Sequence, residues 1–114
     1  MDNNTPEIII LKNPGAVAEY AADRFLNISA EAKKENRIKH ISLSGGKTPA
    51  LLFKLLSSNK YKQMIIWQNI NLWWGDERTV PPDDPESNFG NTNKLLLSKT
   101  NIPFLNIHRI KGEL

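Results

Sequence analysis

The chain has 114 residues, of which 39% are apolar and 24% charged, with a formal net charge of +3 at pH 7. This length fits one domain, residues 1–114, and the composition is typical of a globular protein rather than a disordered one. Without cysteine the chain can form neither disulfides nor thiolate metal sites. The basic residues are scattered instead of forming a stripe, so we expect no nucleic-acid partner.

The N-terminal sequence gives no sign of export or of membrane insertion. Residues 1–6 lack the basic segment and apolar run of a secretion signal. The longest apolar stretch, residues 8–11, is far too short to cross a bilayer. We therefore expect a cytoplasmic protein without a membrane partner, whose positive charge would help to attract a small anionic substrate.

The first predicted elements are a strand and a long helix. Residues 7–12 contain a continuous, mostly β-branched apolar run at 8–11, which predicts a strand covered on both faces. Asn13–Gly15 then interrupts the pattern. Apolar residues recur at three- and four-residue intervals from 17 to 28, which indicates a helix that ends in the polar run 33–36.

A second strand and helix follow. Residues 38–43 alternate as a strand and lead into a glycine-containing turn. After this turn, Thr48 is a suitable N-cap and Pro49 a suitable first residue of a helix. Leucines at residues 51–56 give that helix its apolar face, and the polar residues 57–59 end it.

The rest of the chain contains two further strands. Residues 61–68 are expected to be a short connection, and the apolar run 70–74 predicts a third strand. Three prolines and three acidic residues predict an irregular surface loop over 80–87. A leucine-containing helix is expected over 88–99 and a fourth strand over 106–110.

This order of elements predicts an α/β fold with a Rossmann-like parallel sheet, whose strands are joined by crossover helices. In such sheets, ligands bind at the carboxyl ends of the strands. Two polar clusters, residues 44–48 and 76–78, each follow directly after a predicted strand. Their shared position indicates a binding site at that edge of the sheet.

The first cluster has features of a phosphate site. Paired glycines, Gly45 and Gly46, allow a ligand to approach the main chain closely. The helix that follows offers free N–H groups and the positive end of its dipole, and Ser44, Lys47 and Thr48 could add donors. The alternative is a tight turn with an ordinary cap. The glycine spacing fits neither a Walker loop nor a dinucleotide-binding fingerprint.

The second cluster places two carboxylates beside an arginine. Arg78 could bind an anion through two hydrogen bonds, and Asp76 could orient a hydroxyl group or a water. The alternative is a surface ion pair that leads into an acidic loop. Ser87–Asn88 is expected to cap the next helix.

The histidines and the tryptophan pair carry weaker signals. His40 lies within a predicted strand and is expected to be a packing or edge residue. His108 lies in the last strand, where a structural role is favoured and a catalytic role stays open. Trp73 and Trp74 alternate along a strand, so one is expected on each face of the sheet.

Together these segments resemble the 6-phosphogluconolactonase family. The matching stretches are Ile41–Leu52, Leu72–Pro82, Asp84–Phe89 and Asn106–Glu113, in the family's order and approximate spacing. The string Gly-Asp-Glu-Arg-Thr-Val-Pro followed by Ser-Asn is specific, whereas several related families share the Ser-Gly-Gly turn. The resemblance covers almost the whole chain, as the N-terminal part of a longer lactonase-type domain, so the sheet is expected to be incomplete.

The resemblance implies a fold shared with glucosamine-6-phosphate deaminase and ribose-5-phosphate isomerase. It implies hydrolysis of 6-phosphogluconolactone to 6-phosphogluconate in the oxidative pentose phosphate pathway, without a metal or cofactor. The residues that would hold the substrate phosphate are Ser44, Gly45, Gly46, Lys47 and Thr48. Lys47 stands where a small residue or arginine is often found. Arg78 would bind the anionic substrate, Asp76 would position the lactone or the water, and Glu77 would orient Arg78.

The family's general base, a histidine in an Asp-Gly-His segment, would lie beyond residue 114, as would a second basic phosphate-binding residue. Because a general base contributes about 10²- to 10⁴-fold, we expect this chain alone to turn over little or no substrate. Unpaired sheet edges and exposed apolar faces would favour self-association or association with the C-terminal part.

Three alternatives stay open. An aminosugar-phosphate deaminase of the same fold would generally continue Asp-Glu with an aromatic residue, where this chain has Arg78. A non-catalytic phosphosugar sensor would be expected to carry a helix-turn-helix before its first strand, and none precedes residue 7. The third alternative is an accessory half-domain that completes its fold with a partner.

Overall fold

The structure is a computed structural model that describes residues 6–114. The elements in chain order are α1 (Pro14–Glu35), β1 (Lys39–Leu43), α2 (Lys47–Leu56), α3 (Asn59–Met64), β2 (Ile70–Trp74), α4 (Asn88–Leu95), the 3₁₀ turns η1 (Leu97–Lys99) and η2 (Phe104–Asn106), and β3 (Ile107–His108). The strands form one parallel sheet in the order β1-β2-β3. The predicted α/β fold with a parallel sheet and crossover helices is therefore confirmed.

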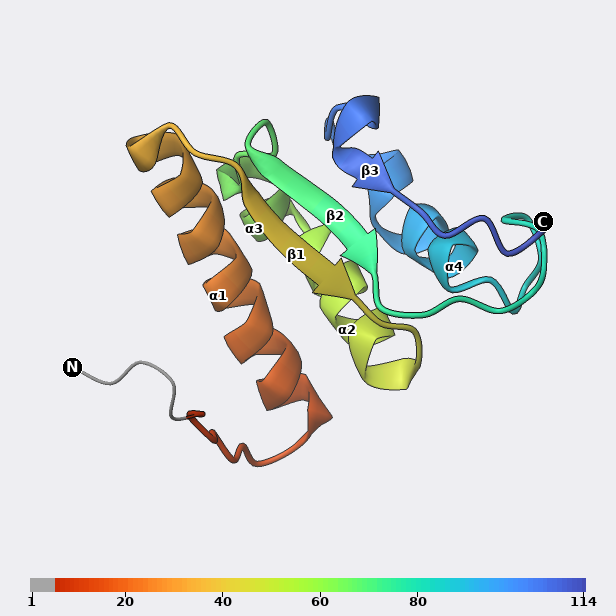
Figure 1. The fold of residues 1–114 in the computed structure, drawn as a ribbon. Coiled ribbons are helices and arrows are strands. Elements are labelled where there is room, and N and C mark those ends of the chain that lie inside the picture. The colour runs from red at the N-terminus through yellow and green to blue at the C-terminus, as the bar shows by residue number, and fades with distance from the viewer. Residues whose placement is uncertain (1–5) are drawn as a thin grey trace.

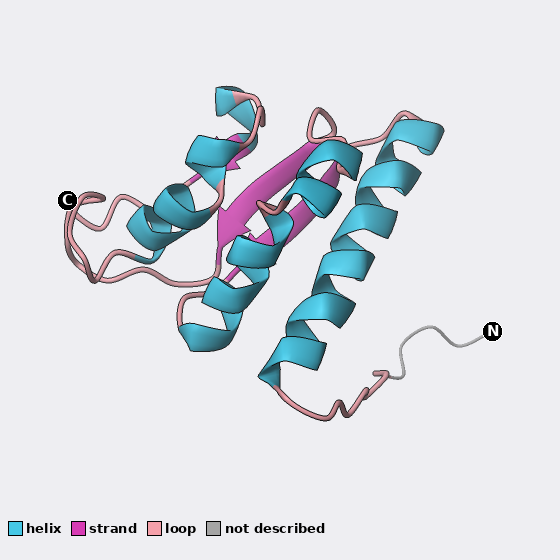
Figure 2. Cartoon of the chain, turned by 180° about the vertical axis from the view of Figure 1, so that it is seen from behind, coloured by secondary structure: helices cyan, strands magenta, loops and turns pink. Residues whose placement is uncertain are grey.

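All four α-helices lie on one side of the sheet (Figure 1), and Figure 2 shows the same layer from behind. The side chains of β2 explain this arrangement. Ile70, Leu72 and Trp74 point into the helical layer and are 0–5% exposed, whereas Trp73 points away and is 42% exposed. The predicted placement of the two tryptophans on opposite faces is confirmed. Phe53 and Trp67 complete the core between sheet and helices.

Helix α1 has strong signals at both ends. The Asn13 side chain accepts a hydrogen bond from Ala16 N–H at 2.8 Å, and Pro14 occupies the first helical position, where its missing N–H costs nothing. At the other end Asn36 adopts a left-handed conformation with φ of 52° and ends the helix. The helix predicted from the apolar periodicity of residues 17–28 is confirmed, and these two local signals set its ends.

The prediction of a strand over residues 7–12 is wrong for the part of the chain that the structure describes. Residues 7–12 form neither helix nor strand, and Ile8 and Ile10 are 83% and 90% exposed. The prediction assumed cover on both faces. A strand also needs a neighbour for its N–H and C=O groups, and none of the three strands found within residues 6–114 pairs with this segment.

Three boundaries also differ from the prediction. Residues 61–68 were expected to be a connection, but α3 occupies Asn59–Met64 because Tyr61 packs into the core. The expected helix 88–99 ends at Leu95, because Leu96 leaves the helical conformation with φ of −133° and ψ of −62°, and residues 97–99 form the 3₁₀ turn η1. The fourth strand of the prediction is shortened to β3.

The start of α2 also differs. Gly46, not Thr48, is the N-cap, and no side chain caps this helix. Thr48 and Pro49 lie in the first turn, where the backbone N–H groups have no partner within the helix, so proline is tolerated there. Ala50 N–H makes the first helical hydrogen bond, to the Gly46 carbonyl at 3.1 Å.

Candidate functional site

The two predicted clusters meet at one edge of the sheet. Leu43 and Trp74, the last residues of β1 and β2, are paired in the parallel register. Gly75 N–H then donates a hydrogen bond to the Leu43 carbonyl at 2.9 Å. Figure 1 shows the glycine turn before α2 and the loop after β2 leaving the sheet side by side. The structure therefore brings residues 44–48 and 76–78 to the same edge.

Asn88 joins these two segments. Gly45 packs so closely on its side chain that a Cβ atom at position 45 would overlap the Asn88 Oδ1. From the other side, the Asn88 amide donates to the Asp76 carbonyl at 3.3 Å and to Asp76 Oδ1 at 3.4 Å. Asn88 is 9% exposed, so this contact between glycine turn and acidic loop is shielded from water.

The glycine turn offers mainly backbone to a ligand. Gly46 has φ of +117°, a conformation that other residues rarely adopt. Ser44, Lys47 and Thr48 are exposed beside it. With no side-chain cap, the first N–H groups of α2 face solvent at the positive end of the helix dipole. This arrangement suits an anion such as a phosphate group.

Glu77 has a structural task that the sequence did not reveal. Its Oε1 accepts hydrogen bonds from the N–H groups of Arg78 at 2.8 Å and Asn88 at 2.7 Å. Its Oε2 accepts from Phe89 N–H at 3.0 Å and the Ser87 hydroxyl at 3.1 Å. Burial alone would raise the pKa of Glu77, but these hydrogen bonds outweigh it and lower the pKa below its ordinary value. The carboxylate thus fixes the start of α4 to the loop after β2.

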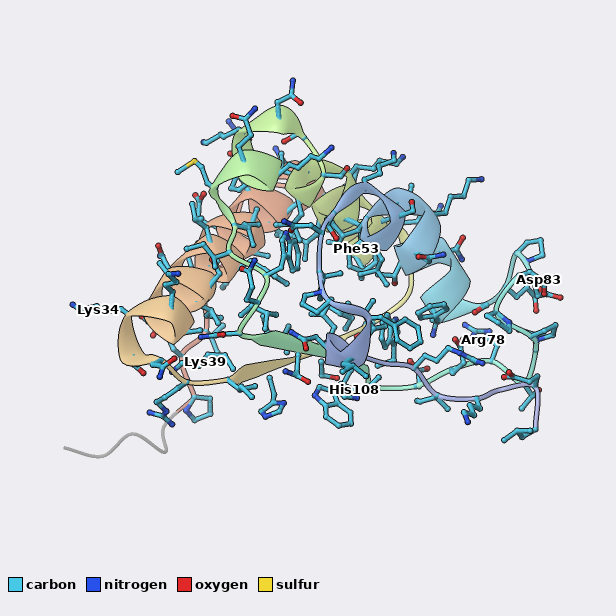
Figure 3. The ribbon with its side chains drawn as sticks, turned by 90° about the horizontal axis from the view of Figure 1, so that it is seen from above. Lys34, Lys39, Phe53, Arg78, Asp83 and His108 are labelled. Atoms are coloured by element: carbon cyan, nitrogen blue, oxygen red, sulfur yellow. The ribbon has the colours of Figure 1, made fainter. Side chains whose placement is uncertain are left out.

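Arg78 and Asp76 are exposed at the same edge (Figure 3 labels Arg78). Within residues 6–114 no carboxylate lies within ion-pair distance of the Arg78 guanidinium. The alternative of a surface ion pair is therefore wrong for Arg78 in the described chain. Glu77 holds the Arg78 backbone and not its side chain, which leaves the guanidinium available for an anion.

The start of α4 confirms one prediction and extends it. Ser87 is the N-cap, and its hydroxyl accepts a hydrogen bond from Gly90 N–H at 2.9 Å. Asn88 was expected only to help this cap, but its side chain instead bridges Gly45 and Asp76. No local sequence signal reveals this bridge, because its partners are 43 and 12 positions away along the chain.

The two histidines lie elsewhere, on the face of the sheet opposite the helices. Trp73 Nε1 donates to His40 Nδ1 at 3.0 Å, and the Trp73 ring stacks on His108 with centroids 4.0 Å apart. His108 Nε2 is hydrogen bonded to Asn71 Oδ1. As expected, His40 lies on an edge strand. His108 is the last residue of β3, but its ring lies on the Trp73 face of the sheet and is engaged there with Trp73 and Asn71.

The wider surface adds two facts. A hollow of about 540 Å³ between α3 and η1, lined in part by Lys62, Trp67 and Lys99, belongs to a different part of the molecule from the glycine turn. Among residues 6–114, acidic and histidine side chains form no group of three or more that could hold a metal ion. Over the same residues, no helix is long and apolar enough to span a membrane.

A parallel α/β sheet with a glycine turn and an exposed arginine at its carboxyl edge is an arrangement that suits a small anion. A family model described as glucosamine-6-phosphate isomerases/6-phosphogluconolactonase matches residues 12–114. The chain belongs to this family.

Individual relatives agree with this assignment. The chain is 50% identical over 96 residues to a 6-phosphogluconolactonase of Haemophilus influenzae and 48% identical to one of Aggregatibacter actinomycetemcomitans. In both cases the match covers 84% of this chain and 41% of the relative, so the chain spans about two-fifths of their length.

Solved structures give the same fold. The crystal structure of devB protein is 51% identical, with a TM-score of 0.85 over 92% of this chain and 42% of that one. A monomeric glucosamine-6-phosphate deaminase, 18% identical with a TM-score of 0.77, shares the fold alone.

Proposed function

We propose that the protein containing this chain hydrolyses 6-phosphogluconolactone to 6-phosphogluconate. One observation carries the proposal: the glycine turn and the Arg78 loop leave paired strands at one edge and are joined there by Asn88. In this proposal an anion at that edge binds both the start of α2 and the Arg78 guanidinium. The identity of about 50% to proteins named 6-phosphogluconolactonase supports this substrate.

In this proposal the substrate phosphate binds at the start of α2. The groups that contribute are the backbone of Gly45 and Gly46 and the side chains of Ser44, Lys47 and Thr48. Arg78 binds the same anionic substrate, and Asp76 orients the lactone or the attacking water. Glu77 holds the Arg78 backbone through its N–H group.

The reaction also needs a group that takes a proton from the attacking water. Attack on the lactone carbonyl gives a tetrahedral intermediate, whose collapse breaks the ring C–O bond and leaves a hydroxyl group and a carboxylate. His40 and His108 are engaged with Trp73 on the opposite face of the sheet, which argues against either as the base. We propose that a histidine outside these 114 residues acts as base, so that this chain alone is at most weakly active.

The face of the sheet opposite the helices supports a proposal about assembly. His40, Trp73 and His108 lie on it, and Trp73 is 42% exposed. Parallel sheets are usually covered on both faces. We propose that this face is covered by a further part of the same protein or by self-association. Light scattering during size-exclusion chromatography distinguishes the two, because only self-association multiplies the mass.

For the environment of the protein we keep the expectations drawn from the sequence: a cytoplasmic phosphosugar-binding enzyme of the pentose phosphate pathway, without nucleic-acid or membrane partners. The scattered basic residues and the absence of a long apolar run support this proposal.

The deciding experiment compares two proteins: the 114-residue chain, and the protein encoded by the complete reading frame that contains it. Each receives freshly prepared 6-phosphogluconolactone, with 6-phosphogluconate release followed through a coupled dehydrogenase. We expect turnover only by the longer protein. Equal rates would disprove the proposed external base, and deamination of glucosamine-6-phosphate in place of lactone hydrolysis would favour the deaminase alternative.

A further inference from the structure

The C-terminal segment Arg109–Glu113 lies against the loop that carries Arg78. Gly112 makes the contact: a Cβ atom at this position would overlap the Arg78 carbonyl oxygen and come within 3.0 Å of the Val80 carbonyl. Both obstacles are backbone atoms, which cannot rotate away as the end of a side chain can. Only a residue without a side chain allows the two segments to approach this closely.

Both polar groups of the Arg78 backbone, the N–H and the carbonyl, are hydrogen bonded. Its N–H donates to Glu77 Oε1 at 2.8 Å, and its carbonyl accepts from Val80 N–H at 2.8 Å in a tight turn. Gly112 covers that carbonyl from outside. The side chain of Arg78, in contrast, is exposed and has no ion-pair partner in the described part of the chain. The residue is thus rigid at its backbone and free at its guanidinium.

The segment Arg109–Glu113, which covers the Arg78 carbonyl, is stabilised by an internal ion pair. The Arg109 guanidinium donates to Glu113 Oε1 at 2.9 Å and to Oε2 at 2.7 Å, a bidentate pair. Hydrogen bonding from Arg109 lowers the pKa of Glu113 to about 2, so the pair persists at neutral pH. Arg109 also lies over the Phe89 ring, 5.8 Å from its centroid, and Phe89 N–H donates to Glu77. A closed ring of contacts therefore surrounds the Arg78 backbone.

We propose that Gly112 and the Arg109–Glu113 pair are positioning residues for Arg78, which fix the backbone from which its guanidinium reaches the anionic substrate. This inference rests on the proposed function, in which Arg78 binds substrate. A displacement of about 1 Å in a substrate-binding group can lower the rate about 100-fold. An element that prevents such a displacement therefore acts on substrate binding without touching substrate.

The first test is Gly112→Ala in the protein encoded by the complete reading frame. We expect KM for the lactone to rise about tenfold, with a smaller change in kcat. The same substitution in an Arg78→Ala background should give no further rise, because the residue through which Gly112 acts is gone. Equal effects in both backgrounds would overturn the inference and make Gly112 merely structural. Gly15→Ala, on the exposed first turn of α1, is the matched control and should leave KM unchanged.

The second test reverses the polarity of the Arg109–Glu113 ion pair. Arg109→Glu and Glu113→Arg should each raise KM severalfold, and the double variant should recover most of the loss, since the pair is restored with reversed polarity. Arg109→Lys keeps the positive charge but not the bidentate geometry, so its KM should stay higher than that of the double variant. A double variant no better than the single ones, with unchanged unfolding midpoints, would show that the pair does not position Arg78.

A titration with inorganic phosphate separates this inference from the proposed reaction. We expect phosphate to shift the ¹⁵N–¹H signal of Arg78 Nε in the unsubstituted protein, and Gly112→Ala to weaken that response about tenfold. If lactone turnover is absent but this weakening occurs, the proposed reaction fails and the positioning role stands. If Gly112→Ala leaves the response unchanged, or if phosphate never perturbs Arg78, the positioning role fails whatever the turnover.

Discussion

The turn of residues 44–48 and the loop after β2 meet at the same edge, yet they are held in different ways. The glycine turn has no side-chain cap and exposes Ser44, Lys47 and Thr48. The loop is anchored by four hydrogen bonds to the Glu77 carboxylate. The comparison shows that the turn leaves its polar groups exposed, whereas the loop uses one acidic side chain to hold the backbone of another residue, Arg78, in place.

Removing the anchor should have the largest effect. Glu77→Ala leaves the N–H groups of Arg78, Asn88 and Phe89 without their acceptor, and hydrogen bonds to charged groups contribute about 1.5–3 kcal/mol each. We expect the free energy of unfolding to fall by about 3 kcal/mol, measured by urea denaturation. Glu86→Ala, in the same loop but exposed, is the control and should change it little. Similar losses in both variants would contradict the special role of Glu77.

Arg78→Ala tests the functional side of the comparison. In the protein of the complete reading frame we expect kcat/KM to fall roughly 30- to 100-fold, since a charged hydrogen bond to substrate contributes about 2–3 kcal/mol. The free energy of unfolding should change by less than about 0.5 kcal/mol, because the guanidinium is exposed. Arg37→Ala, at a surface ion pair near the end of α1, is the control. The prediction fails if Arg78→Ala lowers stability but leaves kcat/KM unchanged.

Gly45→Ala tests the contact between the two segments. The new methyl group would overlap the Asn88 amide, and overpacking of this kind costs about 1–3 kcal/mol. Asn88→Ala should remove much of that clash in the double variant. Gly75→Ala is the matched control, since its Cβ would lie 3.6 Å from the Ser42 hydroxyl, an ordinary contact. Urea denaturation measures the stability of Gly45→Ala, Asn88→Ala, their double variant and Gly75→Ala. Equal losses of stability in Gly45→Ala and Gly75→Ala would argue against the bridge.

The pH dependence of stability should be the smallest effect. The pKa of Glu77 is lowered on folding from the ordinary value of 4.5, so the unfolded chain binds the proton more tightly. The stability that Glu77 provides is complete above about pH 4.5 and decreases as the pH falls through the lowered pKa. Urea midpoints at pH 7 and pH 3.5 measure this loss. Glu77→Gln should show less of it, and an identical loss would assign the effect to other carboxyl groups.

The sequence by itself determined the elements whose signals are local. The alternation over residues 38–43, the apolar run 70–74 and the Ser87 cap all depend on neighbours within about four positions, and the structure confirms each. The Asn13 cap with Pro14 is a local signal of the same kind, although the sequence analysis treated Asn13–Gly15 only as an interruption. The placement of both polar clusters at one edge followed as well, because parallel strands joined by crossover helices present their carboxyl ends together.

Only the tertiary structure decided the rest. Residues 7–12 have strand-like composition, but pairing requires a neighbouring strand that the local sequence cannot supply. The Asn88 bridge and the contact of Gly112 with Arg78 join residues 12 to 43 positions apart, where periodicity and capping carry no information. The physical reason is that close packing and hydrogen bonding depend on distances in space, which are set only when the sheet and helices have assembled.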